Sequence, residues 1–333
     1  MKKLINSVEQ VVDDMLEGFA AAYPQYVKRV PGTQVMVRAG GPVKGKVGLV
    51  SGGGSGHEPS HGGFVGFGML DAAVAGAVFT SPTPDQVLAG AKASDGGAGV
   101  LLIIKNYTGD IMNFEMAGEM AQAEGIDIAS VVINDDVAVE NSTWTTGRRG
   151  IAGTVLVHKI AGAKAEAGGT LAEVKAVAEK VIANVRTMGM ALTPCTVPAA
   201  GKPTFQLAEN EMEIGLGIHG EPGTQRVAIQ PANEVAAHLT TKVMDDMKLK
   251  AGEEVAVLIN GLGATPLMEL FIINKTVAEM LHEAKVKVHR TLVGEFMTSL
   301  EMAGCSVTLL RLDNELKALL DAPAETPAFR QGR

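Results

Sequence analysis

The sequence has little of what marks nucleic-acid binders or disulfide-stabilised proteins. Its only cysteines are Cys195 and Cys305, and neither has the spacing of a zinc or redox motif. Two scattered thiols are typical of a protein from a reducing compartment, so we expect a cytoplasmic location. Basic residues are outnumbered, and the formal net charge is −8. A chain without a basic patch or tail is not expected to bind nucleic acid or an anionic membrane.

Long apolar runs are also missing. The longest ones are far shorter than the roughly 20 residues that span a bilayer. At the N-terminus, acidic residues recur at helical spacing within residues 9–17 and interrupt the apolar sequence, so no signal-peptide core can form there. We therefore predict an amphipathic N-terminal helix and no membrane segment. The motif GxxxxGK[ST] does not occur, which excludes a Walker-type nucleotide site.

What the sequence does contain is a regular alternation of short apolar runs and helical patterns. Hydrophobic residues make up 46% of the chain, enough for a large core. The runs 47–50, 99–104 and 129–133 are continuously apolar, as expected for strands covered on both faces. The segments 84–94 and 111–123 between them have helical spacing. This alternation predicts an α/β fold with a largely parallel sheet.

A second domain is predicted after residue 185. A long helix is expected within 170–190, and the proline-containing segment 194–203 follows it. We place the boundary there, which gives an N-terminal domain of residues 1–185 and a C-terminal domain of 186–333. Residues 213–218 and 225–229 are expected to form a hairpin. The remaining segments predict strands at 255–259, 286–293 and 306–310, alternating with helices at 233–246, 266–284 and 314–320.

Two familiar motifs occur in unsuitable surroundings. His57-Glu-Pro-Ser-His61 matches the HExxH zinc motif, which requires both histidines on one face of a helix. Pro59 prevents a helix from including His57, so we predict no metal site. Residues 215–220 match GxGxxG, but a turn sequence and no helix follows them. A dinucleotide fingerprint needs that helix, so we expect no nucleotide site there either.

Three other segments share one layout, in which an apolar strand runs into a glycine-containing turn that ends on a reactive side chain. The first leads to His57, the second to Lys105 and Asp110, and the third to His219. Ligands of open α/β sheets bind at the carboxyl ends of strands. Glycines within 52–56 would let backbone N–H groups approach an anionic oxygen. The pattern predicts a small-molecule site with acid and base groups.

Each of these residues also has a structural explanation that the sequence leaves open. The glycine run could be a tight turn, and His219 could be an ordinary structural histidine. Asp110 could be the N-cap of a helix that begins at Ile111. Lys105 at a strand end could be a solvated charge. The other histidines are interpreted as structural or surface residues: His61, His158, His238, His282 and His289.

At these residues the sequence resembles the dihydroxyacetone kinase K-subunit family. The resemblance covers essentially the whole chain and includes SGGGSGHEPSHGGFVG, KNYTGD, EIGLGIHGEPG and NGLGATPLMEL. It implies two α/β domains, a three-layer α/β/α N-terminal domain and a two-layer C-terminal domain with a mixed sheet. It also implies that His219 attacks the ketone carbon of dihydroxyacetone and holds it as a hemiaminal. Asp110 would be the base, and His57 a second acid/base or orienting group. Gly54, Ser55, Gly56 and Lys105 would line the same pocket.

The resemblance also implies partners. ATP-using members carry a nucleotide-binding domain after this region, and the sequence has none, so we expect the phosphotransferase-system-dependent type. There a nucleotide-binding L subunit would carry ADP or ATP with magnesium, and an M subunit would be the indirect phosphoryl donor. This chain would then hold neither metal nor cofactor, and we expect it to be a homodimer.

Three alternatives stay open at this point. The chain could be a non-catalytic paralogue that binds the ketone and regulates transcription. It could phosphorylate a four-carbon ketose such as erythrulose. It could also be a lipid-binding protein of similar two-domain fold, which would have no use for a nucleophilic histidine.

Overall fold

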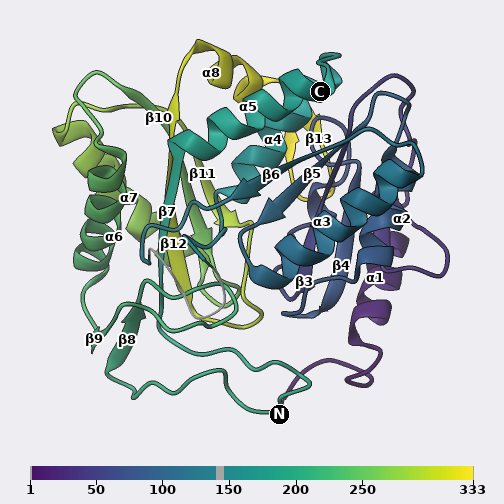
Figure 1. Ribbon diagram of the computed structural model, residues 1–333. Helices are drawn as coiled ribbons and strands as arrows, with labels where there is room; N and C mark the ends of the chain where they lie inside the picture. The colour runs from purple at the N-terminus through teal and green to yellow at the C-terminus, as the bar shows by residue number, and fades with distance from the viewer. Residues whose placement is uncertain (1, 140–145, 333) are drawn as a thin grey trace.

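The first domain is built on a six-stranded sheet in the order β1-β2-β4-β3-β5-β6 (Figure 1). The computed structural model describes residues 2–139 and 146–332. β3, β4, β5 and β6 run parallel, whereas β1 and β2 add an antiparallel edge. The strands of this sheet are β1 (Val27–Arg29), β2 (Val35–Arg38), β3 (Gly48–Ser55), β4 (Ala72–Val78), β5 (Val100–Lys105) and β6 (Ile128–Ile133).

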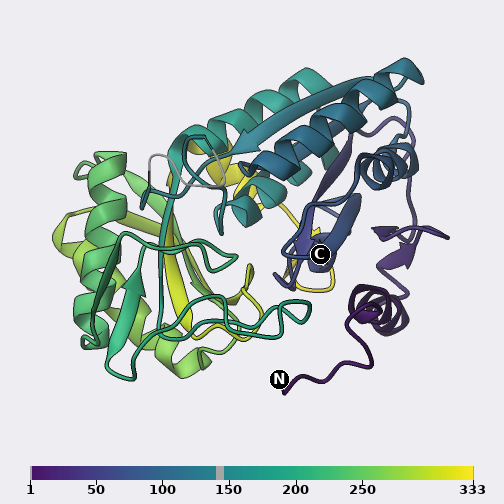
Figure 2. The same ribbon diagram turned by 60° about the horizontal axis from the view of Figure 1, so that its bottom comes forward.

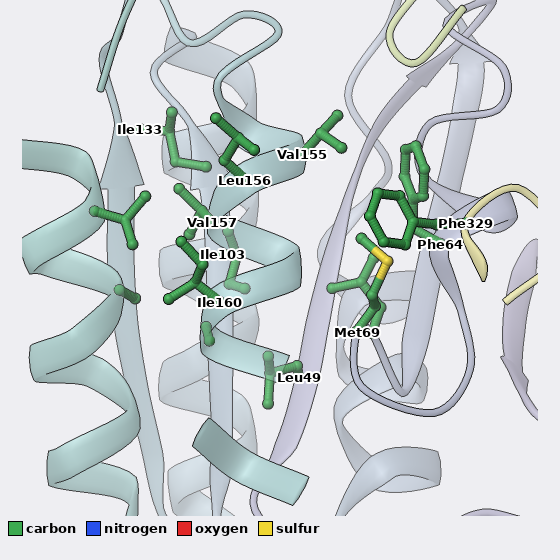
Figure 3. Packing of buried hydrophobic residues seen from close by; sticks show 14 of the residues in the cluster. Leu49, Phe64, Met69, Ile103, Ile133, Val155, Leu156, Val157, Ile160 and Phe329 are labelled. Carbon is green, nitrogen blue, oxygen red and sulfur yellow. The ribbon is translucent and has the colours of Figure 1, made fainter. Parts of the chain in front are cut away.

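Helices cover both faces of this sheet. Along β5, Leu102 and Ile104 pack against α2 (Pro84–Ser94) and α3 (Thr108–Ala123). Leu101 and Ile103 point the other way and join a larger cluster. The helices of that second face are α1 (Val11–Ala22), α4 (Thr154–Glu166) and α5 (Leu171–Asn184). Figure 3 shows Ile103 and Leu49 facing Leu156 and Ile160 of α4. The continuous apolar runs therefore arise as predicted, because alternate side chains of each strand enter two cores.

The second domain contains a mixed sheet in the order β11-β10-β12-β7-β8-β9. Only β10 and β11 are parallel to each other, and the predicted hairpin forms between β8 and β9. One face is covered by α6 (Ala232–Met247) and α7 (Leu267–Glu283). The strands are β7 (Val185–Ala191), β8 (Glu211–Ile214), β9 (Gln225–Ala228), β10 (Glu254–Gly261), β11 (Lys287–Glu295) and β12 (Gly304–Leu312). The three-layer and two-layer α/β arrangement predicted from the sequence is confirmed.

The two domains share a core. Leu258 of β10 and Leu310 of β12 belong to the same buried cluster as Leu156 of α4. Figures 1 and 2 show the purple-to-blue first domain on one side and the green-to-yellow second domain on the other, with α4 and α5 close to both. After β12, the helix α8 (Asn314–Asp321) packs on α4, and Phe329 lies near Phe64 (Figure 3). The chain end is completed by β13 (Ala324–Glu325) and β14 (Arg330–Gln331), and a short 3-10 turn, η1 (Gly62–Phe64), follows β3.

One helix prediction is wrong at its end. The helix expected to run toward residue 190 begins with a Thr170–Glu173 capping box but stops at Asn184. Residues from Val185 form β7, in which Val185 pairs with Leu310 of β12. The methionines there have good helix propensity, but pairing in the centre of a sheet overrides it. The boundary proposed at residue 185 thus falls where the second sheet starts. Within the described part of the chain, no helix is both long and apolar enough to cross a bilayer.

Candidate active site

An open cleft of about 740 Å³ lies between the two domains. It sits at the carboxyl ends of the parallel strands β3, β4 and β5, where a ligand site is expected in an open α/β sheet. The second domain closes it with the turn that carries His219. The first domain lines the cleft with Gly54, Phe79, Thr80, Ser81, Tyr107, Thr108, Gly109, Asp110 and Asn113, and the second with Val197, Thr204, His219, Gly220, Glu221 and Pro222.

The side chain of His219 is held in one tautomer by a carboxylate. Its Nδ1 lies 2.8 Å from Oε1 of Glu221, and its backbone N–H donates to Oε2 at 2.9 Å. A carboxylate can only accept, so Nδ1 carries a proton, and in the neutral form of the ring the lone pair is on Nε2. The rings of Tyr107 and Phe79 pack against the imidazole edge-on, with centroid distances of 4.6 and 5.1 Å. A neutral imidazole fixed in this way is a competent nucleophile toward a carbonyl carbon.

Glu221 was not predicted as a site residue. Burial raises the pKa of its carboxyl group. The charge and hydrogen bond of His219 and the charge of Arg149 outweigh that effect and lower the pKa to about 2. The carboxylate fits beneath the turn because residue 217 is glycine: a Cβ there would lie 2.1 Å from Oε2 of Glu221. The spacing His-x-Glu in a turn could have indicated this pair, since a carboxylate two residues away can reach both the ring and the backbone.

His57 lies beside His219 but is fully buried. Its Nδ1 is 2.7 Å from the carbonyl oxygen of Thr298, so Nδ1 donates and Nε2 is the unprotonated nitrogen. Among the described residues Nε2 has no hydrogen-bond partner. The ring stacks on Phe79, and its centroid is 4.8 Å from that of His219. Burial, followed by the charges of His219 and Lys105, lowers the pKa of His57 well below its usual range. His57 thus offers a neutral buried acceptor next to the nucleophile.

Asp110 lies in the first turn of α3, and the expectation that it is the N-cap of this helix is wrong. The helix begins at Thr108, and Tyr107 is the N-cap. Asp110 therefore sits where the N-terminal end of the helix dipole stabilises a negative charge. Ser81 donates a short hydrogen bond to its Oδ1, and Nζ of Lys105 is 3.5 Å from its Oδ2. The carboxylate faces the cleft and can accept a proton from a bound hydroxyl.

Lys105 was predicted to line the pocket, but it is not among the residues that line this cleft. It is completely buried behind the glycine run, where Nζ donates to the carbonyl oxygen of Gly52 at 2.7 Å. A Cβ on residue 53 would lie 2.3 Å from Nζ, and the backbone of Gly53 has a φ of +152°. The glycines were expected to bring the backbone close to a ligand. At residue 53 the structure shows a different requirement, which is space for the lysine.

The glycine run itself is mostly strand, since β3 continues to Ser55. Of the residues predicted to line the pocket here, Gly54 does so. Ser55 instead donates to the carbonyl oxygen of Gly76 at 2.7 Å and lines a second cavity. The N–H of Gly56 donates to the carboxylate of Glu58. Any contact of Ser55 or Gly56 with a substrate stays a prediction.

The HExxH sequence does not form a helix, as predicted. Residues 57–61 form turns, and the two histidines have separate partners. In the described ranges no three potential metal ligands come together. His61 was interpreted as a structural or surface residue, and the structure shows the first: it is buried, with Nε2 3.0 Å from Nζ of Lys105. The GxGxxG segment forms a turn after β8 that leads to β9 and not to a helix.

The fold and the cleft together define a two-domain α/β protein with a small-molecule site, at which a nucleophilic histidine from one domain meets a carboxylate base from the other. The chain belongs to the Dak1 family, because the Dak1 domain model matches residues 17–328. It is 57% identical over 330 residues to the Listeria innocua protein named PTS-dependent dihydroxyacetone kinase 1, dihydroxyacetone-binding subunit DhaK, covering 99% of this chain and 100% of that one. The predicted resemblance to the K subunits is thereby confirmed.

Two solved structures have the same fold. One is described as the dihydroxyacetone kinase operon co-activator Dha-DhaQ, with a TM-score of 0.91, 36% identity, and coverage of 98% of this chain and 100% of that one. The other is the dihydroxyacetone kinase of C. freundii in complex with AMP-PNP and Mg²⁺. It also has a TM-score of 0.91, with 35% identity, and the match covers 99% of this chain but 61% of that one.

Proposed function

We propose that this chain is the dihydroxyacetone-binding subunit of a phosphoenolpyruvate-dependent dihydroxyacetone kinase. The observation that carries the proposal is the grouping in one place of the Glu221-bound His219, the neutral His57 and the carboxylate of Asp110. These three groups supply a nucleophile for a carbonyl, an acceptor for a hydroxyl, and a base. The names of the relatives are consistent with this reading of the chemistry.

In the first step, the lone pair of Nε2 of His219 forms a bond to the ketone carbon. The C=O π pair moves onto oxygen, which takes up a proton from solvent water, and the hemiaminal forms with a positively charged imidazole ring; release of the Nδ1 proton to solvent would leave the adduct neutral. The imidazole gains positive charge as the bond forms. Glu221 stabilises that charge through Nδ1–H, as the aspartate of a catalytic triad does. Glycerol has no carbonyl group and cannot react, so the covalent step selects the ketone where binding contacts alone discriminate poorly.

In the second step, Asp110 would accept the proton of a hydroxyl of the bound ketone while that hydroxyl oxygen attacks the terminal phosphoryl group of ATP, with ADP as the leaving group. We propose that the nucleotide, ADP or ATP, and its magnesium come with a nucleotide-binding L subunit, which an M subunit rephosphorylates indirectly. Phosphoryl transfer depends mainly on positioning and on stabilisation of charge, so the two chains would share the task. His57 would accept a hydrogen bond from the substrate and orient it.

We further propose a homodimer. The helix α7 exposes a run of large apolar side chains that the chain itself does not cover: Leu267, Met268, Phe271 and Ile272. Exposed apolar patches of this kind mark protein interfaces. The same residues leave the cleft free, because none of them lines it.

The likeness to an operon co-activator favours a second candidate, a ketone-binding regulator without phosphoryl transfer. Such a protein needs His219 but not Asp110. A four-carbon ketose also remains a candidate substrate, since an open cleft of about 740 Å³ has room beyond a three-carbon ligand.

Two measurements on the full chain test the proposal. With dihydroxyacetone labelled with ¹³C at C2, the ketone resonance should convert to that of a tetrahedral carbon in the wild type and not in His219→Gln. His282→Gln, an exposed position on α7, is the matched control. Turnover is then measured with the purified partner subunits and phosphoenolpyruvate. Ketone capture without turnover would support the regulator, and a shifted resonance in His219→Gln would refute the covalent step.

A further inference from the structure

A row of buried polar side chains extends from Asp110 into the interior of the first domain, away from the cleft. It begins with Lys105 of β5, continues with His61 in the turns after β3, and ends with His158 of α4. All three are buried, and a K subunit's phosphoryl-transfer chemistry as proposed above uses none of them directly. Ionisable side chains are rarely buried in a core unless they are paired, so this row requires an explanation.

We propose that His61 and His158 are positioning residues that, through Lys105, hold a positive charge beside the carboxylate of Asp110. The inference rests on the proposed function, because Asp110 is the base of that reaction. It gives Lys105, whose side chain is completely buried behind Gly53, a task as the counter-charge of Asp110.

The contacts of Lys105 define its form. Its Nζ has three oxygen or nitrogen neighbours: the carbonyl oxygen of Gly52 at 2.7 Å, Nε2 of His61 at 3.0 Å and Oδ2 of Asp110 at 3.5 Å. An ammonium group has three N–H bonds to donate, and each of these neighbours can accept one. The carboxylate adds charge attraction, which is stronger between two buried side chains than between exposed ones.

The ammonium form fixes the proton positions of both imidazoles. Nε2 of His61 must accept from Lys105, so the proton of His61 is on Nδ1. That nitrogen lies 3.0 Å from Nε2 of His158, which must then accept in turn. The proton of His158 is therefore also on Nδ1, which has no partner among the described residues. Both rings have to be neutral, and burial together with the charge of Lys105 lowers the pKa of His158 to about 3 and that of His61 well below its usual range.

The groups that face this row come from several elements. On the side of Lys105 they are Asp110 of α3 and His61, with His57 close enough to affect the pKa values of its neighbours. Burial lowers the pKa of Lys105, and Asp110 raises it. Loss of the acceptor nitrogen Nε2 of His61 would favour the neutral amine form of Lys105. Asp110 would then lose its counter-charge, and a nearby cation favours the carboxylate form that a base requires.

His61 is the better position for a test, because its side chain also borders a second cavity of about 440 Å³ behind β3. A substitution there has space to relax, whereas His158 lies in the packed core of α4. His61→Leu removes the acceptor and keeps an apolar side chain of moderate size. His61→Gln restores an oxygen that can accept from Lys105. His282→Leu on the surface of α7 serves as the matched control.

The experiment measures kcat and KM of the reconstituted kinase from pH 5 to 9 for these variants. In His61→Leu the acid limb of the kcat profile should move to higher pH by about one to two pH units, the effect of one lost hydrogen bond to a charged group. Dihydroxyacetone capture on His219, followed by the ¹³C resonance, should be unchanged. His61→Gln should reverse at least half of that displacement, because the glutamine oxygen restores roughly one hydrogen bond to Lys105 in less favourable geometry.

A profile of His61→Leu that superposes on the wild type would overturn the inference, as would a His61→Gln profile equal to that of His61→Leu. A wild type that does not turn over dihydroxyacetone would instead refute the proposed function, and this outcome is distinguishable from the two that overturn the inference. A third measurement needs no variant to fold: ¹⁵N shifts of the wild-type imidazoles should show Nδ1–H tautomers for both His61 and His158. Protonated Nε2 on both rings would contradict the ammonium form.

Discussion

Replacement of Glu221 by glutamine is the most direct perturbation of the nucleophile, because the two side chains have the same shape. The carboxylate accepts two hydrogen bonds, one from Nδ1 of His219 and one from the His219 backbone N–H. Glutamine has a single acceptor oxygen, so one of these two donors would face an NH₂ group. The variant also has no charge with which to stabilise the imidazolium that forms during attack on the ketone.

The structure gives the size of the effect. In the folded protein the pKa of Glu221 falls from 4.5 to about 2, in spite of its burial. That lowering corresponds to roughly 3 kcal/mol of net stabilisation of the carboxylate. Since only 7% of the side chain is exposed, solvent screens this interaction little. If roughly 2 to 3 kcal/mol of it acts on the charged imidazole in the transition state, kcat/KM for dihydroxyacetone should fall about 30- to 150-fold.

The assay is turnover of dihydroxyacetone by the reconstituted kinase over a range of ketone concentrations. Glu213→Gln is the matched control, since Glu213 supports the same turn through Gly223 and Arg226 without touching His219. Its kcat/KM should stay within about threefold of the wild type, as expected for a site outside the reacting groups. Equal losses in both variants would refute the argument, because the effect would then come from the turn and not from the carboxylate.

The same carboxylate makes a pH-dependent contribution to stability. Its pKa in the folded state is below that in the unfolded state, so the stabilisation is fully present above pH 4.5. It is lost as the pH falls through about 2. The difference in unfolding free energy between the wild type and Glu221→Gln should therefore shrink steadily as chemical denaturation is repeated below pH 4.5. A constant difference down to the acid limit would contradict the assigned charge.

Two further predictions concern the glycine run and the surface of α7. Gly53→Ala should displace Lys105 and reduce kcat, since its Cβ would lie 2.3 Å from Nζ, whereas Gly97→Ala also places a side chain at positive φ, +88°, but with nothing within 4 Å. Comparable activity of the two alanine variants would show that the lysine is not what requires glycine at residue 53. Phe271→Glu should dissociate the proposed homodimer in sedimentation velocity, because the side chain is 54% exposed among apolar neighbours. Lys275→Glu on the same helix should not, and an unchanged mass for Phe271→Glu would place the interface elsewhere.

The sequence predicted the regular elements of the first domain well, for a physical reason. The strand β5 sends alternate side chains into two cores, so its whole length is apolar and its limits are clear. The helix α2 was predicted at its observed limits, since Pro84 begins it and Asp95 with two glycines follows Ser94. The error at residues 185–190 arose because their strand conformation depends on pairing with β12, which lies more than a hundred residues away. Local pattern carries no information on such a partner.

The candidate site was predicted only in part. Which of its features could be predicted again depends on how far apart the contacting residues lie in the sequence. His57, Asp110 and His219 could be proposed because each ends a strand-and-turn segment, and the fold brings such ends together: Asp110 and His219 line the cleft, and His57 is buried beside His219. Glu221 is close to His219 in the sequence and was overlooked. The contacts of Lys105 with His61 could not have been predicted, since they depend on how deep the glycine run lies against β5. Burial, which decides whether a histidine is a surface residue or part of a buried network, is not a property of one segment.

The placement of nucleophile and base on different domains makes their separation a property of the shared core. His219 belongs to the second domain and Asp110 to the first, and the cleft between them is functional only at a fixed width. Leu258 and Leu310 of the second sheet are packed in the same cluster as Leu156 of α4, and α8 returns to pack on α4 as well. A hinge motion would have to open this cluster and expose apolar surface, which is unfavourable. We therefore infer that the cleft is preorganised by the core that the two domains share.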